Sequence, residues 1–319
     1  MVSTTASVRR VATVFGGAGF IGRYVVARLA RLDYVVRVTT RDPSGARFLT
    51  TQGKPGQVVP LVVDLGSDVA VARAVEEASA VVNCVGILAE RRAGDFSRLQ
   101  AELPGRIARM CATHRVERLV HLSAIGADRG SESTYARTKA EGEAALRDGF
   151  PAATILRPSI VFGPEDRFFN RFAEMARLLP VVPVIGGGTR FQPVYVGDVA
   201  DAVVAAVARE DAPGKTYELT GPRADTFRGL LEYMLEVIGR RKKVVEVPPG
   251  IARFQARLLQ RLPDPPLTED QLLLLSRDNV ATGALPGLSE LGITPRPMET
   301  VLPDYLRRFR VGGGRRDAA

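Results

Sequence analysis

The stretch VATVFGGAGFIGRYVVARL, residues 11–29, decides the fold of this chain. An apolar run ends at Phe15 and is followed by three glycines, and the residues after them are spaced as on an amphipathic helix. A strand, a tight glycine turn and a helix in this order are typical of a dinucleotide site, because the helix N-terminus then faces a pyrophosphate. The glycine spacing alone is weak support in a chain with 31 glycines, so the strand and the helix around it carry the prediction. The expected nucleotide contacts in this turn are Gly16, Gly19, Phe20, Ile21 and Gly22.

Apolar runs with the character of strands recur along the first half of the chain, and helical patterns separate most of them. The expected strands are Val11–Phe15, Val35–Thr39, Val58–Val63, Ala80–Val85, Leu119–Ser123 and Thr154–Leu156. This alternation predicts an α/β fold with a doubly wound parallel sheet of the Rossmann type. Beyond Pro158 the expected elements are a strand over Phe191–Val196 and the helices Phe168–Leu179, Asp198–Arg209, Thr226–Gly239, Ile251–Leu262 and Thr268–Asn279.

The change of pattern predicts two domains. Residues 1–165 and 190–220 are expected to form the nucleotide-binding Rossmann domain. Residues 166–189 and 221–310 are expected to form a smaller, mainly helical C-terminal domain, and residues 311–319 a disordered tail. Thr268 and Gln271, three residues apart, predict a capping box at the start of the last helix.

Composition narrows the function classes. The net charge of +9 favours an anionic cofactor, nucleic acid or an anionic membrane surface as a binding partner. The sequence contains no basic stripe interleaved with aromatic residues and no zinc-finger spacing, so nucleic-acid binding is not expected. Cys84, Cys111, His114 and His121 lack the spacing of metal ligands, and we expect no metal and no disulfide framework. No apolar run approaches the roughly 18 residues that span a bilayer, and the start of the chain lacks a signal-peptide pattern.

The residue that follows the second predicted strand selects the nucleotide. NAD-binding folds usually place an acidic side chain there, where it binds the 2′-hydroxyl of the adenosine ribose. Arg41 occupies this region, and a guanidinium pairs well with a 2′-phosphate, so NADP(H) is the expected cofactor. Arg23 and Arg37 are possible electrostatic helpers. In the alternative, Arg41 is a solvated surface residue and Asp42 binds the ribose.

Two further positions follow the ends of predicted strands. Asp64, after the third strand, is placed to meet the adenine, although it could instead cap a helix. Val85 and Gly86, after the fourth strand, are expected to line the cofactor. Both predictions use the rule that ligands of doubly wound sheets bind at the carboxyl ends of the strands.

A second group of residues suggests carbonyl chemistry. Tyr135 and Lys139 are four residues apart and would share one face of a helix. There the ammonium would lower the pKa of the phenol and bind the nicotinamide ribose, while Tyr135 would act as general acid or base. Ser123 would orient a substrate carbonyl.

In the glycine turn and in Ser123, Tyr135 and Lys139, the chain resembles the extended and atypical branches of the short-chain dehydrogenase/reductase superfamily. The resemblance extends from the glycine turn through Tyr135 and Lys139 to the motifs LRPSIVFGP and VYVGDVADAV. It implies that Pro158 and Ser159 contact the nicotinamide. The chain departs from the usual pattern at Phe15, where Thr is common, and in the short spacing from Ser123 to Tyr135.

A narrower resemblance covers nearly the whole chain. FGGAGFIGRYVV, VVNCVGIL, YARTKAEGE, ILRPSIVFGPEDRFFNRFA, FQPVYVGDVADAV and LPDYLRRF together resemble the nucleotide-binding accessory subunits of respiratory complex I and their bacterial relatives. This resemblance implies a tightly held NADPH with a structural role. It also implies partners among the peripheral-arm and membrane-proximal subunits, at the cytoplasmic side of a bacterial inner membrane. The alternatives are a free NADPH-dependent reductase or epimerase, acting on a small carbonyl or a sugar nucleotide, and a nucleotide-sensing regulator without catalysis.

The C-terminal region contains a further helical pattern with basic residues. Arg253, Arg257 and Arg261 repeat every four residues. The apolar residues at helical spacing are Ile251, Phe254, Leu258, Leu259 and Leu262. Such a helix could bind an anionic lipid surface or a partner protein. In the alternative, its apolar residues face the core and its arginines are simply solvated.

Overall fold

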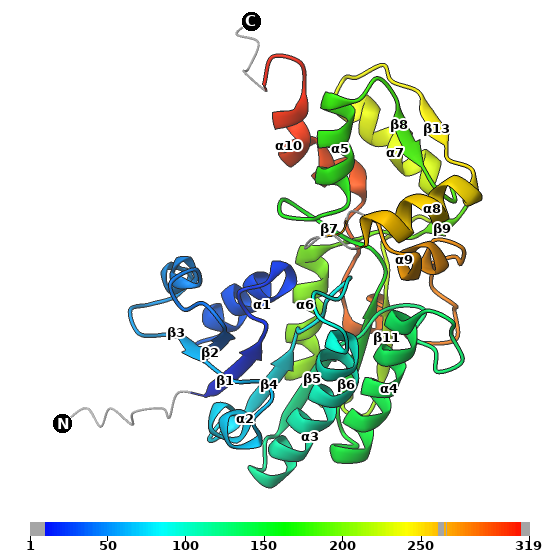
Figure 1. Cartoon of the computed structure of the whole chain (residues 1–319). Coiled ribbons are helices and arrows are strands. Elements are labelled where there is room, and N and C mark those ends of the chain that lie inside the picture. The colour runs from blue at the N-terminus through cyan, green and yellow to red at the C-terminus, as the bar shows by residue number, and fades with distance from the viewer. Residues whose placement is uncertain (1–9, 261–264, 266, 314–319) are drawn as a thin grey trace, which may run out of the picture.

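The computed structural model describes residues 10–260, 265 and 267–313, and a parallel sheet of seven strands forms its centre. The strands lie in the order β11-β6-β5-β4-β1-β2-β3 (Figure 1). They are β1 (Val11–Phe15), β2 (Val35–Thr40), β3 (Val58–Val62), β4 (Ala80–Asn83), β5 (Arg118–Leu122), β6 (Thr154–Pro158) and β11 (Thr216–Leu219). All neighbouring pairs are parallel, and the order of the strands reverses between β1 and β4. The predicted doubly wound α/β fold is confirmed.

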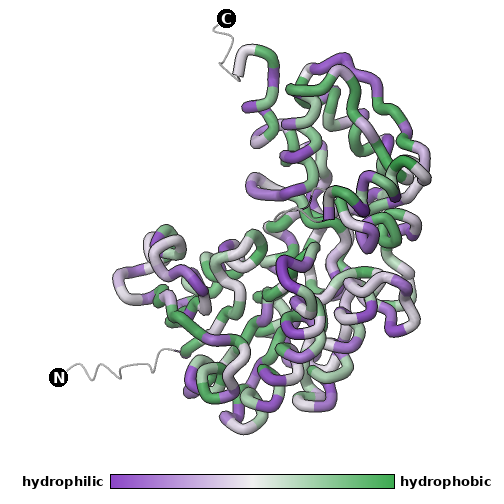
Figure 2. The backbone as a smooth tube through the Cα atoms, in the orientation of Figure 1, coloured by the Kyte–Doolittle hydropathy of each residue, from purple (hydrophilic) through white to green (hydrophobic). Residues whose placement is uncertain are grey.

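Helices cover both faces of this sheet. On one face, α1 (Phe20–Arg31) and α6 (Val196–Ala208) pack against a core built on the small and β-branched residues of β1, β2 and β4. On the other face lie α2 (Asp68–Val75), α3 (Leu103–Thr113) and α4 (Thr134–Gly149). Strands covered on both sides need apolar residues without alternation, and this explains the continuous apolar runs in the sequence. Figure 2 shows those runs gathered in the sheet.

A second, smaller core lies beyond the carboxyl ends of the strands, in the upper part of Figure 1. Aromatic side chains such as Phe162, Phe169 and Phe227 form much of it. Its helices are α5 (Phe169–Leu178), α7 (Phe227–Val237) and α10 (Met298–Leu306). The predicted smaller, mainly helical C-terminal region is therefore present, and the exact domain boundaries stay a prediction.

Short elements complete the fold. Three two-stranded pairs join β7 (Val161–Phe162) to β10 (Val194–Tyr195), β9 (Arg190–Phe191) to β12 (Asp225–Thr226), and β8 (Val182–Val184) to β13 (Val244–Glu246). The remaining helical elements are η1 (Arg47–Gln52), η2 (Ser97–Glu102), α8 (Pro249–Leu259), α9 (Glu269–Leu274), η3 (Ser289–Leu291) and η4 (Arg307–Phe309).

Three expectations about the elements were wrong in detail. The strand expected over Phe191–Val196 is divided, because Pro193 has no N–H to donate and the two halves pair with different strands. The strand expected over Ala80–Val85 ends at Asn83. The helix expected over Thr268–Asn279 ends at Leu274, and the residues after it pair instead with the segment around Phe191.

The remaining expectations concern the capping box, the C-terminal tail and membrane-spanning helices. The capping box of Thr268 and Gln271 is confirmed. Of the expected tail, residues 314–319 lie outside the described residues. Within residues 10–260, 265 and 267–313, no helix combines the length and the apolar character needed to cross a membrane.

Candidate nicotinamide dinucleotide site

The glycine turn forms a cradle that larger residues would fill. Gly16 adopts a φ of +72°, which side-chain-bearing residues rarely adopt. A Cβ on Gly22 would lie 2.3 Å from the carbonyl oxygen of Gly16 and 2.6 Å from the Cα of Gly17. Gly19 caps α1 without any side-chain hydrogen bond. The first N–H groups of α1, on Phe20, Ile21 and Gly22, thus have no side-chain cap, and a pyrophosphate fits this cradle.

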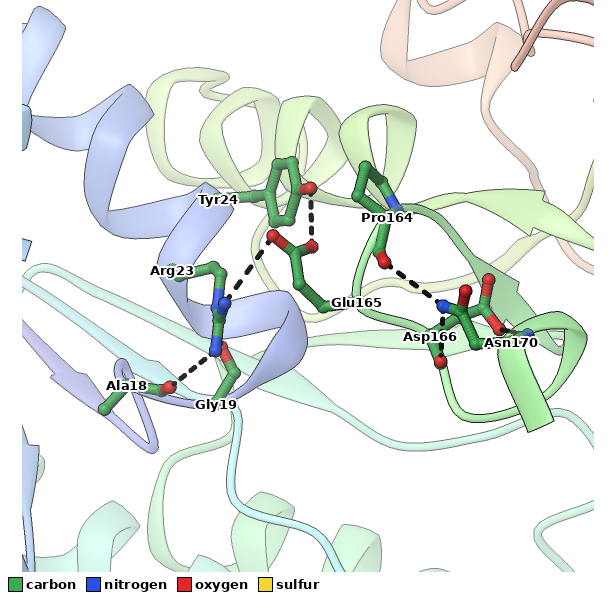
Figure 3. A network of polar contacts seen from close by, with 8 residues as sticks. All are labelled: Ala18, Gly19, Arg23, Tyr24, Pro164, Glu165, Asp166 and Asn170. Atoms are coloured by element: carbon green, nitrogen blue, oxygen red, sulfur yellow. Dashed lines mark hydrogen bonds and ion pairs between the residues drawn. The ribbon is translucent and has the colours of Figure 1, made fainter. Parts of the chain in front are cut away.

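A loop from the C-terminal side of the sheet closes over this turn. Figure 3 shows Glu165, which follows β7, beside the first turn of α1. Its carboxylate accepts a hydrogen bond of 2.7 Å from the Tyr24 hydroxyl and lies 3.5 Å from the Arg23 guanidinium. Arg23 in turn donates to the carbonyl oxygens of Ala18 and Gly19. Glu165 therefore fixes the helix end that carries the cradle.

The three candidate arginines have different environments. Arg23 is engaged by Glu165 and lies over the ring of Phe48 at 5.0 Å. Arg37 donates to the backbone carbonyl of Glu76 beyond the end of α2. Arg41 is exposed after β2 and has no hydrogen bond or ion pair with any residue that the structure describes. Of the three guanidinium groups, that of Arg41 is thus the one without a partner in the part of the chain that the structure describes.

Two other predicted contacts lie at the ends of their strands. Asp64 is exposed after β3 and accepts a hydrogen bond of 2.9 Å from the N–H of Gly66. It does not cap α2, because Ser67 is the residue that does so. Gly86 lies beside Lys139, since a Cβ at this position would be 3.4 Å from the Lys139 ammonium.

The ammonium of Lys139 is buried at the end of β5. Its Nζ donates to the carbonyl oxygen of Leu122 over 3.1 Å, which leaves further donors unused. Burial lowers the pKa of Lys139 to about 8. The hydroxyl of Ser123, the next residue after Leu122, is buried without a partner in the described chain. These unused polar groups fit the hydroxyls and the amide of a nicotinamide riboside.

Tyr135 shares the helix face with Lys139, but its electrostatics differ from the expectation. The phenol packs edge-on against Phe96 at 6.0 Å between ring centroids. Burial, reinforced by the negative charge of Asp270, raises the pKa of Tyr135 to about 12. The expected lowering by Lys139 is therefore absent from this structure. A phenol with a raised pKa is a poor general base at neutral pH.

Asp270 belongs to a segment that crosses the site, residues 268–279, which we name the strap. Its carboxylate accepts hydrogen bonds from the Ser133 hydroxyl at 2.9 Å, the Thr134 N–H at 2.5 Å and the Tyr135 N–H at 3.2 Å. It thereby satisfies the N-terminus of α4 at the turn that carries Tyr135.

The rest of the strap is anchored to the ends of neighbouring strands. The Gln271 side chain donates to the carbonyl oxygen of Leu88 over 3.2 Å. Asn279 donates to the carbonyl oxygen of Ile125 over 3.2 Å and accepts the Ser159 hydroxyl over 2.7 Å. The strap is therefore held against the segments that follow β4, β5 and β6.

An ion pair with a buried carboxylate joins α4 to β6 beside Lys139. Glu143 on α4 is buried one turn beyond Lys139, and both its oxygens accept hydrogen bonds from Arg157 on β6, at 2.8 and 2.6 Å. Arg157 precedes Pro158 and Ser159, which end β6 and begin the loop beyond it. The pair thus fixes α4 relative to the strand end that carries the expected cofactor contacts.

Sequence reasoning missed Glu143, Glu165, Asp270 and Asn279. For Glu143 a signal was present, because Tyr135, Lys139 and Glu143 repeat every four residues along one helix face. For the other three, the partners are more than one hundred residues away in the chain, and no local pattern reveals them.

A family model matches residues 12–220, the part of the chain that contains the sheet and the glycine cradle. The chain belongs to the NAD dependent epimerase/dehydratase family. This membership confirms the resemblance to extended short-chain dehydrogenases and reductases, and with it the binding of a nicotinamide nucleotide by the family fold. Relatives of this epimerase/dehydratase family member also match its C-terminal region, which the family model does not include.

The mouse protein "NADH dehydrogenase [ubiquinone] 1 alpha subcomplex subunit 9, mitochondrial" is 37% identical over 303 residues, which cover 94% of this chain and 80% of that protein. The "NADH-ubiquinone oxidoreductase 40 kDa subunit, mitochondrial" of Neurospora crassa is 32% identical over 300 residues, which cover 94% of this chain and 79% of that protein. A "Ceramide reductase" of Caulobacter vibrioides is 29% identical over 246 residues, which cover 76% of this chain and 75% of that protein.

Solved structures share the fold at lower identity. The UDP-glucose 4-epimerase of Thermus thermophilus in complex with NAD superposes with a TM-score of 0.69 at 23% identity. The alignment covers 97% of this chain and 100% of the epimerase chain. The likeness therefore includes the C-terminal region as well as the sheet.

Proposed function

We propose that this protein is an NADP(H)-binding accessory subunit of respiratory complex I, with a mainly structural role. One observation carries the proposal: the similarity to proteins named as complex I subunits extends over 94% of the chain, at 37% identity in the mouse relative. The strap supports a cofactor that is retained, because its Asp270 accepts the Tyr135 N–H and its Asn279 accepts the Ser159 hydroxyl. A bound dinucleotide would supply hydride chemistry, whereas the structural role needs only its binding.

The residues that would hold the cofactor follow from the site. The N–H groups at the start of α1 would bind the pyrophosphate, and Arg41 the 2′-phosphate. Lys139 and Ser123 would bind the nicotinamide riboside. The other cofactor contacts that we propose are Gly16, Gly19, Phe20, Ile21, Gly22, Asp64, Val85, Gly86, Tyr135, Pro158 and Ser159.

Arg41→Ala is expected to reduce the preference for NADPH over NADH. A charge-assisted hydrogen bond contributes about 1.5–3 kcal/mol, so NADPH affinity should fall by at least about tenfold while NADH affinity changes little. Calorimetric titration of both nucleotides measures this change. Arg31→Ala, an exposed arginine at the other end of α1, is the matched control. Stronger binding of NADH than of NADPH by the unmodified protein would contradict the assignment.

Helix α8 suggests how the protein attaches to its complex. Its buried side is made of the small Ala252 and Ala256, whereas Phe254 is 70% exposed and Ile251 and Leu258 are also exposed. The alternative of a core-facing apolar side is therefore wrong for these three residues. An exposed aromatic and aliphatic face of this kind is typical of a binding surface.

The basic residues expected on α8 are not all unpaired and exposed. Arg253 is exposed without an ion pair in the described chain, but Arg257 pairs with Glu269 at 2.7 Å. Arg261 and Leu262 lie outside the described residues, and the side chain of Leu259 is likewise not described. We therefore propose that α8 contacts peripheral-arm or membrane-proximal subunits through its apolar face. The protein would thus be peripheral at the cytoplasmic side of a bacterial inner membrane.

The proposed function predicts that the native protein sediments with membranes and copurifies with complex I after mild detergent extraction. Phe254→Ser with Leu258→Ser should reduce this recovery strongly, because interface aromatic residues often contribute 2 kcal/mol or more, roughly thirtyfold in affinity. Val62→Ser with Val69→Ser removes two equally exposed residues from the nucleotide-binding region and should leave recovery unchanged. A native protein found wholly in the soluble fraction, without complex I subunits, would defeat the proposal.

Charge reversal tests whether lipid also contributes at α8. Arg253→Glu with Arg257→Glu and Arg261→Glu should weaken membrane association more at low salt than at high salt if anionic lipid is part of the site. An effect that does not depend on salt would assign α8 to protein contacts.

A free NADPH-dependent reductase is the second candidate, because Tyr135 and Lys139 keep their place on one face of α4 and one relative is named a ceramide reductase. If the protein reduces carbonyl compounds, Tyr135→Phe should lower turnover by about 10²-fold or more and leave NADPH binding intact. NADPH oxidation in a screen of carbonyl substrates measures this. Robust oxidation that persists unchanged in the variant would exclude the role of Tyr135, and its absence in the unmodified protein favours the accessory subunit.

A further inference from the structure

Three segments of the C-terminal region meet at the end that points away from the sheet, at the top of Figure 1. They are residues 177–181 at the end of α5, 240–245 from the loop after α7 into β13, and 307–311 after α10, and we name them the distal patch. Backbone and side-chain contacts join them. Arg240 donates to the carbonyl oxygen of Phe309 over 3.1 Å, and Lys242 donates to that of Leu179. The patch is therefore one continuous surface.

The charge of the distal patch is one-sided. Its three segments contain eight basic residues and no acidic residue: Arg177, Arg240, Arg241, Lys242, Lys243, Arg307, Arg308 and Arg310. The last five residues of α5, α7 and α10 add only the carboxylates of Glu174, Glu236 and Asp304.

Most cations of the patch also lack counter-charges among the residues that the structure describes. Within the described chain, only Arg177 among the eight has a carboxylate at ion-pair distance, that of Glu174 at 3.0 Å. Arginines elsewhere, such as Arg28 and Arg157, are paired with carboxylates. Unpaired cations gathered at one end of a protein create a positive potential that attracts a polyanionic surface.

Exposed aliphatic side chains lie among these cations. Leu178 and Val311 are 74% and 76% exposed, and Leu179, Val181 and Val245 are also exposed. They come from all three segments, so they are distributed over the patch rather than lining a groove. Separate exposed aliphatic side chains between cations are suited to a fluid layer of acyl chains and headgroups, into which they can insert one by one.

We propose that the distal patch binds the anionic surface of a phospholipid bilayer. This inference deepens the proposed peripheral attachment, and it assigns the lipid contact to a surface distinct from the apolar face of α8. Nucleic acid, the other common polyanion, is disfavoured because single strands are bound by stacking on exposed aromatic rings. The one aromatic residue of the patch, Phe309, is buried under the guanidinium of Arg308.

Sedimentation with vesicles tests the proposal on the purified full chain, without complex I. The protein should bind vesicles of phosphatidylcholine mixed with phosphatidylglycerol, release them as salt is raised, and bind little to phosphatidylcholine alone. Arg241→Gln with Lys243→Gln and Arg307→Gln should weaken binding by about 100-fold, because each cation near an anionic surface adds several-fold to the affinity. The control, Arg31→Gln with Arg73→Gln and Arg109→Gln, removes the same charge from exposed helix positions of the nucleotide-binding region and should bind as the unmodified protein does.

Leu178→Ser with Val311→Ser keeps every charge, and it should weaken vesicle binding by about tenfold through loss of inserted apolar area. Equal binding to neutral vesicles, an equal loss in the control variant, or tighter binding to a single-stranded oligonucleotide than to anionic vesicles would overturn the proposal. The outcome is separate from that of the proposed function. Vesicle binding without recovery of complex I would reject the subunit assignment alone. Recovery of complex I without vesicle binding would reject only the proposal that the distal patch binds lipid.

Discussion

Gly22→Ala is expected to weaken dinucleotide binding strongly. The new Cβ would lie 2.3 Å from the carbonyl oxygen of Gly16, a distance that real atoms do not tolerate. Because the obstacle is backbone, the glycine turn and the start of α1 must move apart, which costs about 1–3 kcal/mol of stability. The same movement displaces the N–H groups that face the pyrophosphate. Since hydrogen bonds to charged groups contribute about 1.5–3 kcal/mol each, affinity for NADPH should fall at least about 100-fold.

Titration of NADPH fluorescence and thermal unfolding of the same samples separate the two effects. Gly250→Ala is the matched control, because a Cβ at that position of α8 meets open space. It should bind NADPH as the unmodified protein does. If Gly22→Ala binds NADPH normally, the glycine turn is not the pyrophosphate site and the cofactor assignment is wrong.

Glu143→Gln is expected to destabilise the fold by about 3 kcal/mol, because it leaves the guanidinium of Arg157 without its buried counter-charge. Loss of this ion pair should also disturb the proposed cofactor site, since the pair fixes α4 relative to the end of β6. NADPH affinity should therefore fall together with stability. Chemical denaturation in the absence and presence of NADPH measures both quantities.

Glu141→Gln provides the control on the same helix. Glu141 has no ion pair in the described chain, and its substitution should change stability by less than about 0.5 kcal/mol. Adding Arg157→Met to Glu143→Gln should restore part of the lost stability, because the uncompensated charge is then removed. Equal stability of Glu143→Gln and Glu141→Gln would show that the ion pair does not hold α4 and β6 together.

The parts of the site that could be predicted from the sequence are those that depend on residues close together in the chain. The cradle of Gly16, Gly19 and Gly22 is encoded by backbone geometry within seven residues, and a Cβ at any of the three would crowd backbone atoms. Tyr135 and Lys139 share a helix face because four residues are about one turn. Helix α8 shows the limit of such patterns. Its period was visible, but whether Ala252 or Phe254 faces the core depends on the surface against which it packs.

The sequence by itself determined the doubly wound sheet, the glycine cradle and the basic character of the C-terminal region, because local backbone preferences and apolar periodicity act within one element or between neighbours. Only the tertiary structure decided the environment of these groups. Asp270 reaches the N-terminus of α4 from 135 residues away, and its charge adds to the burial that raises the pKa of Tyr135. The distal patch is likewise assembled from three segments that are distant in sequence. Such electrostatic neighbours are set by how separate elements pack, and the energy of that packing is spread over contacts that no short stretch of sequence contains.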